Sequence, residues 1–280
     1  MIATLGKISW AVRCSARYVV LILMPAVILS GCGTLPNGRG WGQDAFHPID
    51  TDRISRAAHD AFFNANTLAP LAAAAVFGID DLDERTSDWA VKHTPIFGSP
   101  RDARDASDDL KEALEVEAVI TAILAPSGGT FDQWVISKAR GAGVELLAAG
   151  LTDNTVSLLK DETNRTRPDG TSDRSFPSAH ASEAFAFATL SNRNIESSRM
   201  PQLVRPVIKT GNIVLASGVA WARIEAQRHY PSDVLASAAL AHFLTAFIHD
   251  AFMNLPEDGE AEFAVFPTDG GMGAGLALRF

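Results

Sequence analysis

Apolar positions recur along most of the chain at the three-to-four-residue spacing of amphipathic helices. This spacing predicts helices over residues 52–64, 67–78, 80–92, 105–125, 131–160, 178–192, 203–222 and 232–253. Small residues at 72–75 and 236–239 allow close helix–helix approach, as a bundle requires. The longest apolar run, Val234 to Phe252, contains His242 and His249, which favours a core helix over a lipid-facing one. We therefore expect an all-α helical bundle over residues 51–255.

The pattern changes at the N-terminus, where Lys7, Arg13 and Arg17 precede a 12-residue apolar run over 18–29. This length is typical of a signal-peptide core and is shorter than the roughly 20 residues that span a bilayer. The run ends in Leu29-Ser30-Gly31-Cys32, which resembles the lipobox of bacterial lipoproteins. The resemblance implies a signal peptide over 1–31 and lipidation of Cys32. It also implies a membrane anchor on the periplasmic side of the cell envelope, at the outer membrane rather than the inner one. The alternative is an uncleaved anchor with an incidental cysteine.

Two further segments depart from the helical pattern. Residues 32–50 are rich in Gly and Pro and predict a lipidated tether. Residues 256–280 contain two alternating stretches around the turn-forming Pro267 to Gly271, which predicts a short C-terminal β-hairpin. Because one hairpin cannot close a membrane barrel, we expect it to pack on the helical body.

Composition excludes several classes of function. The chain has 280 residues, 47% of them hydrophobic, and a net charge of −9, which suits one globular domain and disfavours nucleic acid as a partner. Cys14 and Cys32 leave the predicted domain without a disulfide or thiolate metal site. The histidines outside the motifs below lack zinc-site spacing, and we expect His242 and His249 to satisfy core hydrogen bonds. These histidines are His47, His59, His93, His242 and His249. Residues 80–84 lack the glycine of a calcium loop and are interpreted as a solvated acidic turn.

Three clusters of residues carry the candidate chemistry, and they occur in a fixed order along the chain. They are Lys160 with Arg167-Pro168, then Pro177-Ser178-Ala179-His180, then Ala222-Arg223 with His229 and Asp233. Each cluster alone has an ordinary interpretation, as charges at a helix end, a helix start or a surface histidine. Their combination is what predicts a site, since short motifs taken singly often mislead.

A phosphoryl group in transfer spreads negative charge over three oxygens, so its site needs several fixed cations. Lys160, Arg167 and Arg223 supply them, and the N–H groups at a helix start near Ser178 add donors. Two histidines can then divide the work, one attacking phosphorus and the other protonating the departing oxygen. Asp233 follows His229 by four residues, close enough to accept a hydrogen bond from one ring nitrogen. The nearby Arg165, Arg174 and Arg228 are assigned no role.

These clusters resemble the PAP2 superfamily, which includes type 2 phosphatidic acid phosphatases, class A acid phosphatases and vanadium haloperoxidases. The family pattern is K-x6-RP, PSGH and SR-x5-H-x3-D, and this chain matches its spacing over 160–168, 177–180 and 222–233. The resemblance implies a bundle of the PAP2/haloperoxidase type. It implies His229 as nucleophile, Asp233 as its orienter and His180 as general acid. Phosphate would be held by Lys160, Arg167, Ser178, Ala179 through its N–H, and Arg223. Two residues depart from the pattern, Ala179 replacing glycine and Ala222 replacing serine.

We therefore expect a metal-independent phosphatase without a cofactor, acting on phosphate monoesters or diphosphates of small molecules or lipids. Vanadate would inhibit it as a transition-state mimic. The first alternative is a vanadium-dependent haloperoxidase, which would hold vanadate as cofactor in the same pocket. The second is a non-catalytic envelope lipoprotein.

Overall fold

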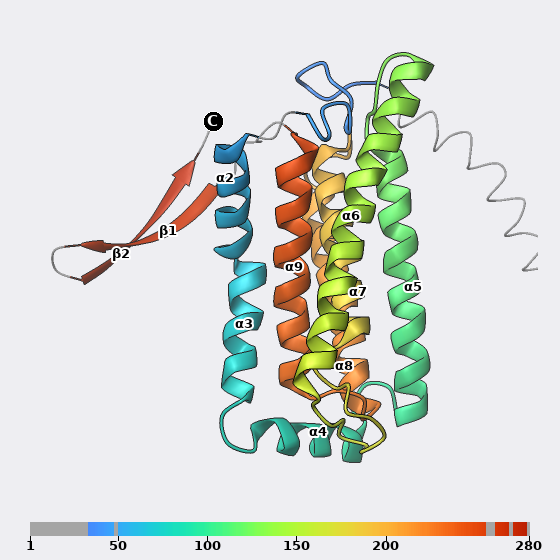
Figure 1. Ribbon diagram of the computed structural model, residues 1–280, viewed down its shortest axis with the longest axis vertical. Helices are drawn as coiled ribbons and strands as arrows, with labels where there is room; N and C mark the ends of the chain where they lie inside the picture. Colours follow the sequence, from blue (N-terminus) through green and yellow to red (C-terminus); the bar gives the residue numbers. More distant parts are fainter. Residues whose placement is uncertain (1–32, 48–49, 256–260, 269–270, 279–280) are drawn as a thin grey trace, which may run out of the picture.

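The computed structural model describes residues 33–47, 50–255, 261–268 and 271–278, and its body is a bundle of helices (Figure 1). The helices are α2 (Thr51–Phe62), α3 (Ala65–Phe77), α4 (Leu82–His93), α5 (Pro100–Leu124), α6 (Phe131–Thr163), α7 (Ala179–Ser197), α8 (Arg205–Glu225) and α9 (Pro231–Met253). The predicted all-α body is confirmed. The predicted signal peptide and Cys32 lie outside the described residues.

Helix α9 is central, and it packs against α2, α3, α6 and α7. Helices α5 and α8 complete the bundle by packing on α7 and on each other. Helices α2 and α3 follow one another along α9, and α4 lies across the lower end of the bundle in Figure 1. Alanine dominates the buried positions, including Ala184, Ala188, Ala216 and Ala238. These small side chains bring the helix axes close together, as the sequence pattern predicts.

Helix α9 has the length and hydropathy of a membrane span, but 61% of its most apolar window is buried inside the bundle. Its two histidines face protein partners. His242 Nδ1 lies 2.8 Å from the hydroxyl of Thr67 on α3, and His249 Nδ1 lies 3.1 Å from Asp250. In the described part of the chain, α9 therefore has the environment of a core helix.

Helix α5 begins at Pro100 rather than at 105, which corrects the largest boundary error at a helix start. The hydroxyl of Ser99 accepts a hydrogen bond from the N–H of Asp102 at 3.1 Å, and Pro100 occupies the first helical turn. Serine before proline, followed by an acidic residue, is a helix-start signal, and here it extends α5 beyond the amphipathic pattern.

The segment predicted as a tether is folded onto the bundle over residues 33–47, so that prediction is wrong there. Gly33 exchanges two backbone hydrogen bonds with Gly128, at 2.8 and 2.7 Å. Trp41 is 1% exposed and packs with Val144 and Met253. A Cβ at Gly141 would lie 2.2 Å from the Trp41 ring, so the glycine on α6 makes room for the indole. Burial of a large aromatic surface outweighs the flexibility of the Gly-rich sequence.

At the C-terminus, β1 (Ala261–Thr268) and β2 (Gly271–Leu278) pair antiparallel, with Ala261 opposite Leu278. The pair projects away from the bundle beside α2 (Figure 1), so the expectation that it packs on the helical body is wrong. A two-stranded hairpin gains little stability by itself, and the fold is therefore defined by the helices.

Candidate active site

His229 lies in the loop between α8 and α9 and is 2% exposed. Its Nδ1 lies 2.6 Å from the backbone carbonyl oxygen of Ser175. A carbonyl only accepts hydrogen bonds, so this contact places the ring proton on Nδ1 and leaves the lone pair on Nε2. Burial lowers the pKa of His229 well below its usual range, and the charges of Arg223 and Lys160 lower it further. The ring is therefore a neutral imidazole, and its Nε2 has no hydrogen-bond partner among the described residues.

The expected hydrogen bond between His229 and Asp233 is replaced by this carbonyl contact, since Asp233 Oδ2 lies 3.8 Å from Nδ1. Asp233 instead accepts from the Ser175 hydroxyl at 2.6 Å and from the Tyr230 N–H at 2.8 Å. Asp233 therefore contacts the two segments that adjoin His229, namely the loop of Ser175 and the start of α9. Burial raises the pKa of Asp233, whereas the positive charge of Arg165 opposes that rise.

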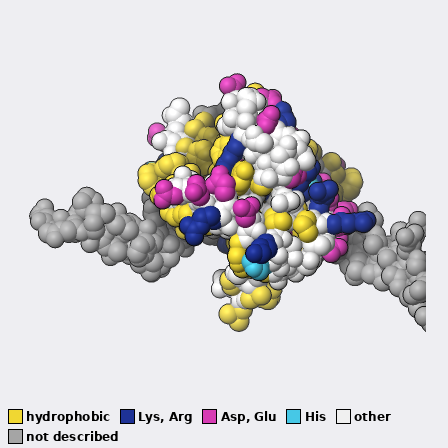
Figure 2. Space-filling view, turned by 90° about the horizontal axis from the view of Figure 1, so that it is seen from below, with side chains coloured by type: hydrophobic (Ala, Val, Ile, Leu, Met, Phe, Trp, Pro, Cys, Tyr) yellow, Lys and Arg dark blue, Asp and Glu magenta, His cyan; other side chains and the backbone are white. Residues whose placement is uncertain are grey.

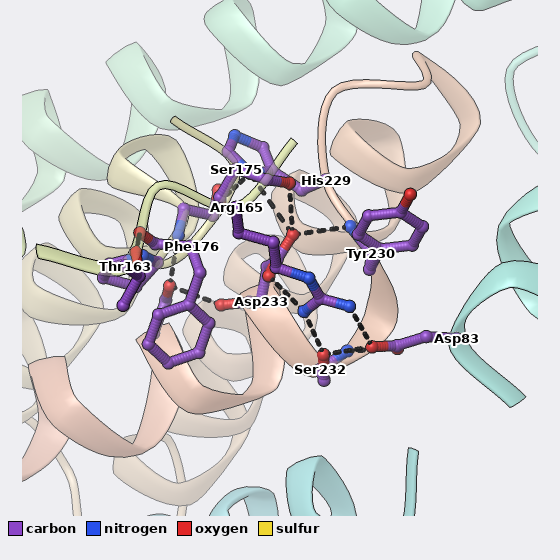
Figure 3. Close-up of polar contacts among 12 residues, drawn as sticks. Asp83, Thr163, Arg165, Ser175, Phe176, His229, Tyr230, Ser232 and Asp233 are labelled. Atoms are coloured by element: carbon purple, nitrogen blue, oxygen red, sulfur yellow. Dashed lines mark hydrogen bonds and ion pairs between the residues drawn. The ribbon is translucent and has the colours of Figure 1, made fainter. Parts of the chain in front are cut away.

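Arg165 holds this carboxylate from the other side (Figure 3). Its Nη1 donates to Asp233 Oδ1 and to the Ser232 hydroxyl, both at 2.7 Å. Its Nη2 donates to Asp83 Oδ2 at 2.8 Å, and its guanidinium lies 4.3 Å from the centre of the Tyr230 ring. The Arg165 guanidinium thus links α4 to the N-terminus of α9, next to the contact between Ser175 and His229.

The interpretation of residues 80–84 as a solvated acidic turn is wrong for Asp83, which is a buried residue of α4. It is 3% exposed, and its Oδ1 accepts the N–H of Ser232 at 2.8 Å. Sequence reasoning also assigned no role to Arg165 and did not consider Ser175. The available signal was the position of Arg165 between Lys160 and Arg167, inside the first motif. Its partners lie 68 and 82 residues away along the chain, beyond the reach of any local pattern.

Lys160 occupies the last turn of α6 and is 7% exposed. Its Nζ donates to the carbonyl oxygen of Arg174 at 3.0 Å and to that of Pro177. Two of its three N–H bonds therefore hold the loop that carries Ser175 and Ser178, and one is left for a ligand. Burial lowers the pKa of Lys160 to about 8, and the neighbouring charge of Arg167 acts in the same direction.

Arg167 follows α6 in the loop, and Arg223 lies in the last turn of α8, where it is 5% exposed. Arg223 Nη1 donates to the hydroxyl of Ser107 on α5 at 3.1 Å. In the described part of the chain, the Nε atoms of both arginines are buried without a hydrogen-bond partner. Burial lowers the pKa of Arg223 to about 10. Buried donors without partners are costly, and a bound anion would satisfy them.

Ser178 caps the N-terminus of α7, and its hydroxyl accepts the N–H of Ala181 at 3.4 Å. The Ser178 N–H donates to the Ser237 hydroxyl at 2.7 Å. Ala179 is the first residue of α7 and has ordinary helical backbone geometry, so alanine in place of glycine brings no strain. The first N–H groups of a helix have no partner inside it, which makes this helix start a natural anion site.

His180 follows Ala179, and its Nε2 lies 2.9 Å from Asp108 Oδ1 on α5. Burial lowers the pKa of His180, the charge of Arg223 lowers it further, and the contact with Asp108 raises it. Arg223 thus acts electrostatically on both His180 and His229. Asp108 is a further site residue that the sequence analysis missed, because a single acid in an acidic helix offers no signal.

The three motifs therefore meet at one end of the bundle. The last turns of α6 and α8 and the first turns of α7 and α9 bring the predicted cations and histidines together. Figure 2 looks onto this end, where Lys and Arg side chains reach the surface in several groups among acidic ones. Lys160 and Arg223 lie beneath that surface. Over the described residues, no group of three or more His, Cys, Asp and Glu is placed to hold a metal ion.

Comparison with known proteins locates the same region. Residues 142–256 match the model of the PAP2 superfamily. The lipid A 1-phosphatase of Porphyromonas gingivalis is 35% identical over 96 residues, which are 34% of this chain and 20% of that protein. The chain therefore spans about a fifth of the length of this curated relative. The crystal structure of a transmembrane PAP2 type phosphatidylglycerolphosphate phosphatase from Bacillus subtilis has a TM-score of 0.49 at 19% identity. That superposition covers 66% of this chain and 92% of the other.

All three motifs, from Lys160 to Asp233, fall inside the matched segment. The structure brings them to one end of an all-α bundle. The PAP2 superfamily model therefore matches the part of the chain that carries all three motifs of the candidate site.

Proposed function

We propose that this chain is a metal-independent phosphatase that hydrolyses phosphate monoesters or diphosphates through a phosphohistidine at His229. The observation that carries the proposal is the state of the His229 ring. The Ser175 carbonyl holds its Nδ1 proton, and the pKa of the ring is well below its usual range. A neutral imidazole with a fixed orientation is a competent nucleophile across mildly acidic and neutral pH.

In the proposed reaction, Nε2 of His229 attacks phosphorus while Arg167, Arg223 and the remaining N–H of Lys160 neutralise the charge on the phosphoryl oxygens. The backbone N–H groups at the start of α7 add further donors. Preorganised donors in a buried site stabilise the transition state because they need no rearrangement during the reaction. Lys160 also keeps the loop of Ser175 in place through its two carbonyl contacts.

His180 is the proposed general acid. Its ring gives a proton to the departing oxygen, and it takes a proton from the water that later hydrolyses the phosphohistidine. Asp108 favours the protonated form of His180. Burial and the charge of Arg223 lower the pKa of this ring, whereas the contact with Asp108 raises it.

Envelope attachment through Cys32 remains part of the proposal. Gly33, the next residue, is paired with Gly128 between α5 and α6, whereas Lys160 lies at the other end of α6. The 33 residues of α6 span about 50 Å. A lipidated Cys32 would therefore hold the active site away from the membrane of attachment. Metabolic labelling with a fatty acid, compared with Cys32→Ala, tests the anchor.

The decisive experiment measures phosphate release from a chromogenic phosphate monoester, with and without a chelator. We expect activity that resists the chelator and falls at least about a thousandfold in His229→Ala. His180→Ala should lose roughly a hundredfold or more. His59→Ala is the matched control, because His59 is an exposed histidine on α2 that contacts only its neighbours Asp60 and Phe63 among the described side chains.

The intermediate is tested by brief mixing with labelled substrate, followed by an alkaline quench. We expect an acid-labile label on the wild type and none on His229→Ala. Halide oxidation by peroxide and vanadate without phosphate release would instead identify a haloperoxidase. If His229→Ala keeps both phosphate release and halide oxidation at wild-type rates, a catalytic role for this site is refuted.

A further inference from the structure

The active-site end of the bundle contains more cations than one phosphoryl group requires. Lys160, Arg167 and Arg223 already oppose the two charges of a phosphate monoester. Arg104 on α5 and Arg228 in the loop before α9 lie beside them and have no part in the mechanism proposed above.

The position of Arg104, an exposed residue of α5, follows from the contacts of its neighbours on that helix. The hydroxyl of Ser107 donates to the Arg104 carbonyl at 2.8 Å and accepts from Arg223 Nη1 at 3.1 Å. Asp108, one helical turn after Arg104, contacts His180 Nε2 at 2.9 Å. Residues three and four apart share a helix face, so Arg104 lies on the face of α5 that borders the proposed general acid.

An ion pair with the loop after α6 fixes the position of Arg228. Its Nη1 donates to Asp169 Oδ2 at 2.8 Å, and its side chain is 24% exposed. Its Nε is buried and has no hydrogen-bond partner among the described residues. Asp169 lies two residues after Arg167, and Arg228 directly precedes His229, so Arg228 connects two of the three motifs.

The four guanidinium groups lie close enough to repel one another. After burial, Arg228 and Arg104 each lower the pKa of both Arg167 and Arg223. Within the described chain, Arg228 is the member of the four with a carboxylate at ion-pair distance. A cationic cluster of this kind, in a chain of net charge −9, is stabilised when an anion occupies it.

We propose that Arg104 and Arg228 form a second anion subsite, which binds the non-reacting phosphate of a diphosphate substrate. The inference rests on the proposed phosphatase function and names its substrate class. The subsite lies on the leaving-group side, because Arg104 shares its helix face with the residue that contacts His180.

His229 Nε2 forms a bond to the terminal phosphorus, and the bond from that phosphorus to the bridging oxygen breaks. The bridging oxygen takes the proton of His180 and leaves as a phosphate monoester, whose charge Arg104 and Arg228 oppose. Water then cleaves the phosphohistidine, releasing inorganic phosphate and returning a proton to His180.

The test compares initial rates of phosphate release from a short-chain alkyl monophosphate and the corresponding alkyl diphosphate at low ionic strength. We expect Arg104→Ala and Arg228→Ala to lower kcat/KM for the diphosphate roughly tenfold more than for the monophosphate, as the loss of a charge-assisted contact predicts. Arg104→Lys should recover part of this preference because it keeps the charge.

Arg101→Ala is the matched control, since Arg101 is exposed on the same helix and no contact among the described residues links it to the site. It should leave both rates within about twofold of the wild type. Long-chain versions of both substrates in phosphatidylcholine vesicles form a second pair of measurements, which distinguishes a lipid source of the diphosphate from a soluble one.

Equal losses on both substrates in Arg104→Ala and Arg228→Ala would overturn the second subsite while leaving the phosphatase intact. Absence of phosphate release by the wild type from every substrate would instead overturn the proposed function and the subsite with it.

Discussion

Replacement of Arg165 by methionine is the most direct test of how the site is held together. The substitution keeps much of the side-chain length but removes hydrogen bonds to Asp83, Asp233 and Ser232. Two carboxylates, whose side chains are 4% and 0% exposed, then lie together without their cation. Removal of one partner from a buried ion pair typically costs roughly 3–5 kcal/mol.

The Arg165 side chain is 30% exposed, so water can partly replace it, and we expect a loss of about 2–4 kcal/mol. For a domain of this size, that loss lowers the Tm by roughly 5–15 °C. The sign of the pH dependence follows from the pKa of Asp233, which Arg165 lowers against the effect of burial. The attraction exists only while Asp233 is ionised. The stability difference between wild type and variant should therefore be largest near neutral pH and shrink as the pH falls.

The assay is thermal unfolding by circular dichroism at neutral and acidic pH, together with kcat on a phosphate monoester. Arg174→Met is the matched control, because Arg174 pairs with Asp161 at the surface and is 48% exposed. Its loss should cost less than about 1 kcal/mol. Asp83→Asn in the Arg165→Met background should recover part of the stability, since it removes one of the two negative charges that repel each other. Equal Tm values for Arg165→Met and Arg174→Met would refute the reasoning.

Three further predictions follow from individual contacts. Asp108→Asn removes a contact that raises the pKa of His180, so the alkaline limb of the kcat/KM profile should move to lower pH; an unchanged or upward-shifted limb would contradict this. Burial lowers the pKa of His242 to about 4. As the pH falls, His242 is therefore protonated in the unfolded chain at a higher pH than in the folded chain. Stability in urea should therefore fall by up to roughly 3 kcal/mol between pH 6.5 and 4, a loss that His242→Leu should reduce. Gly141→Ala should lower the Tm by several degrees because its Cβ meets an indole ring, whereas Gly150→Ala on the same helix has open space and should be neutral or stabilising by about 0.5–1 kcal/mol; similar Tm values for the two would count against this packing.

The folded segment at residues 33–47 changes the expected geometry of an anchored enzyme. A flexible tether would let the domain sample all orientations relative to a membrane. Here the residue after Cys32 is bonded to the bundle at Gly128, and Trp41 fixes the same segment against α6. Under the lipoprotein proposal, the attachment therefore determines which end of the bundle faces outward.

Much of the helical framework follows from local sequence. Helical spacing of apolar residues, the cap at Ser99 and the helix start at Ser178 depend on neighbours within a few positions. The residue types of the three motifs likewise indicate their chemistry without a fold. Cations suited to phosphate and a pair of imidazoles limit the reactions that the clusters can support.

The sequence by itself therefore determined the all-α class, most helix positions and the set of candidate site residues. Only the tertiary structure decided which groups hold them in place. Hydrogen bonds of Asp83, Arg165, Ser175 and Asp108 join residues that are 54 to 149 positions apart in the sequence. Charged side chains that the sequence suggests are at the surface, such as Asp83, are instead buried and paired. Trp41 likewise lies in the core, although the sequence around it is rich in glycine. The physical reason is the same in each case, because desolvation and long-range pairing depend on which segments meet in space.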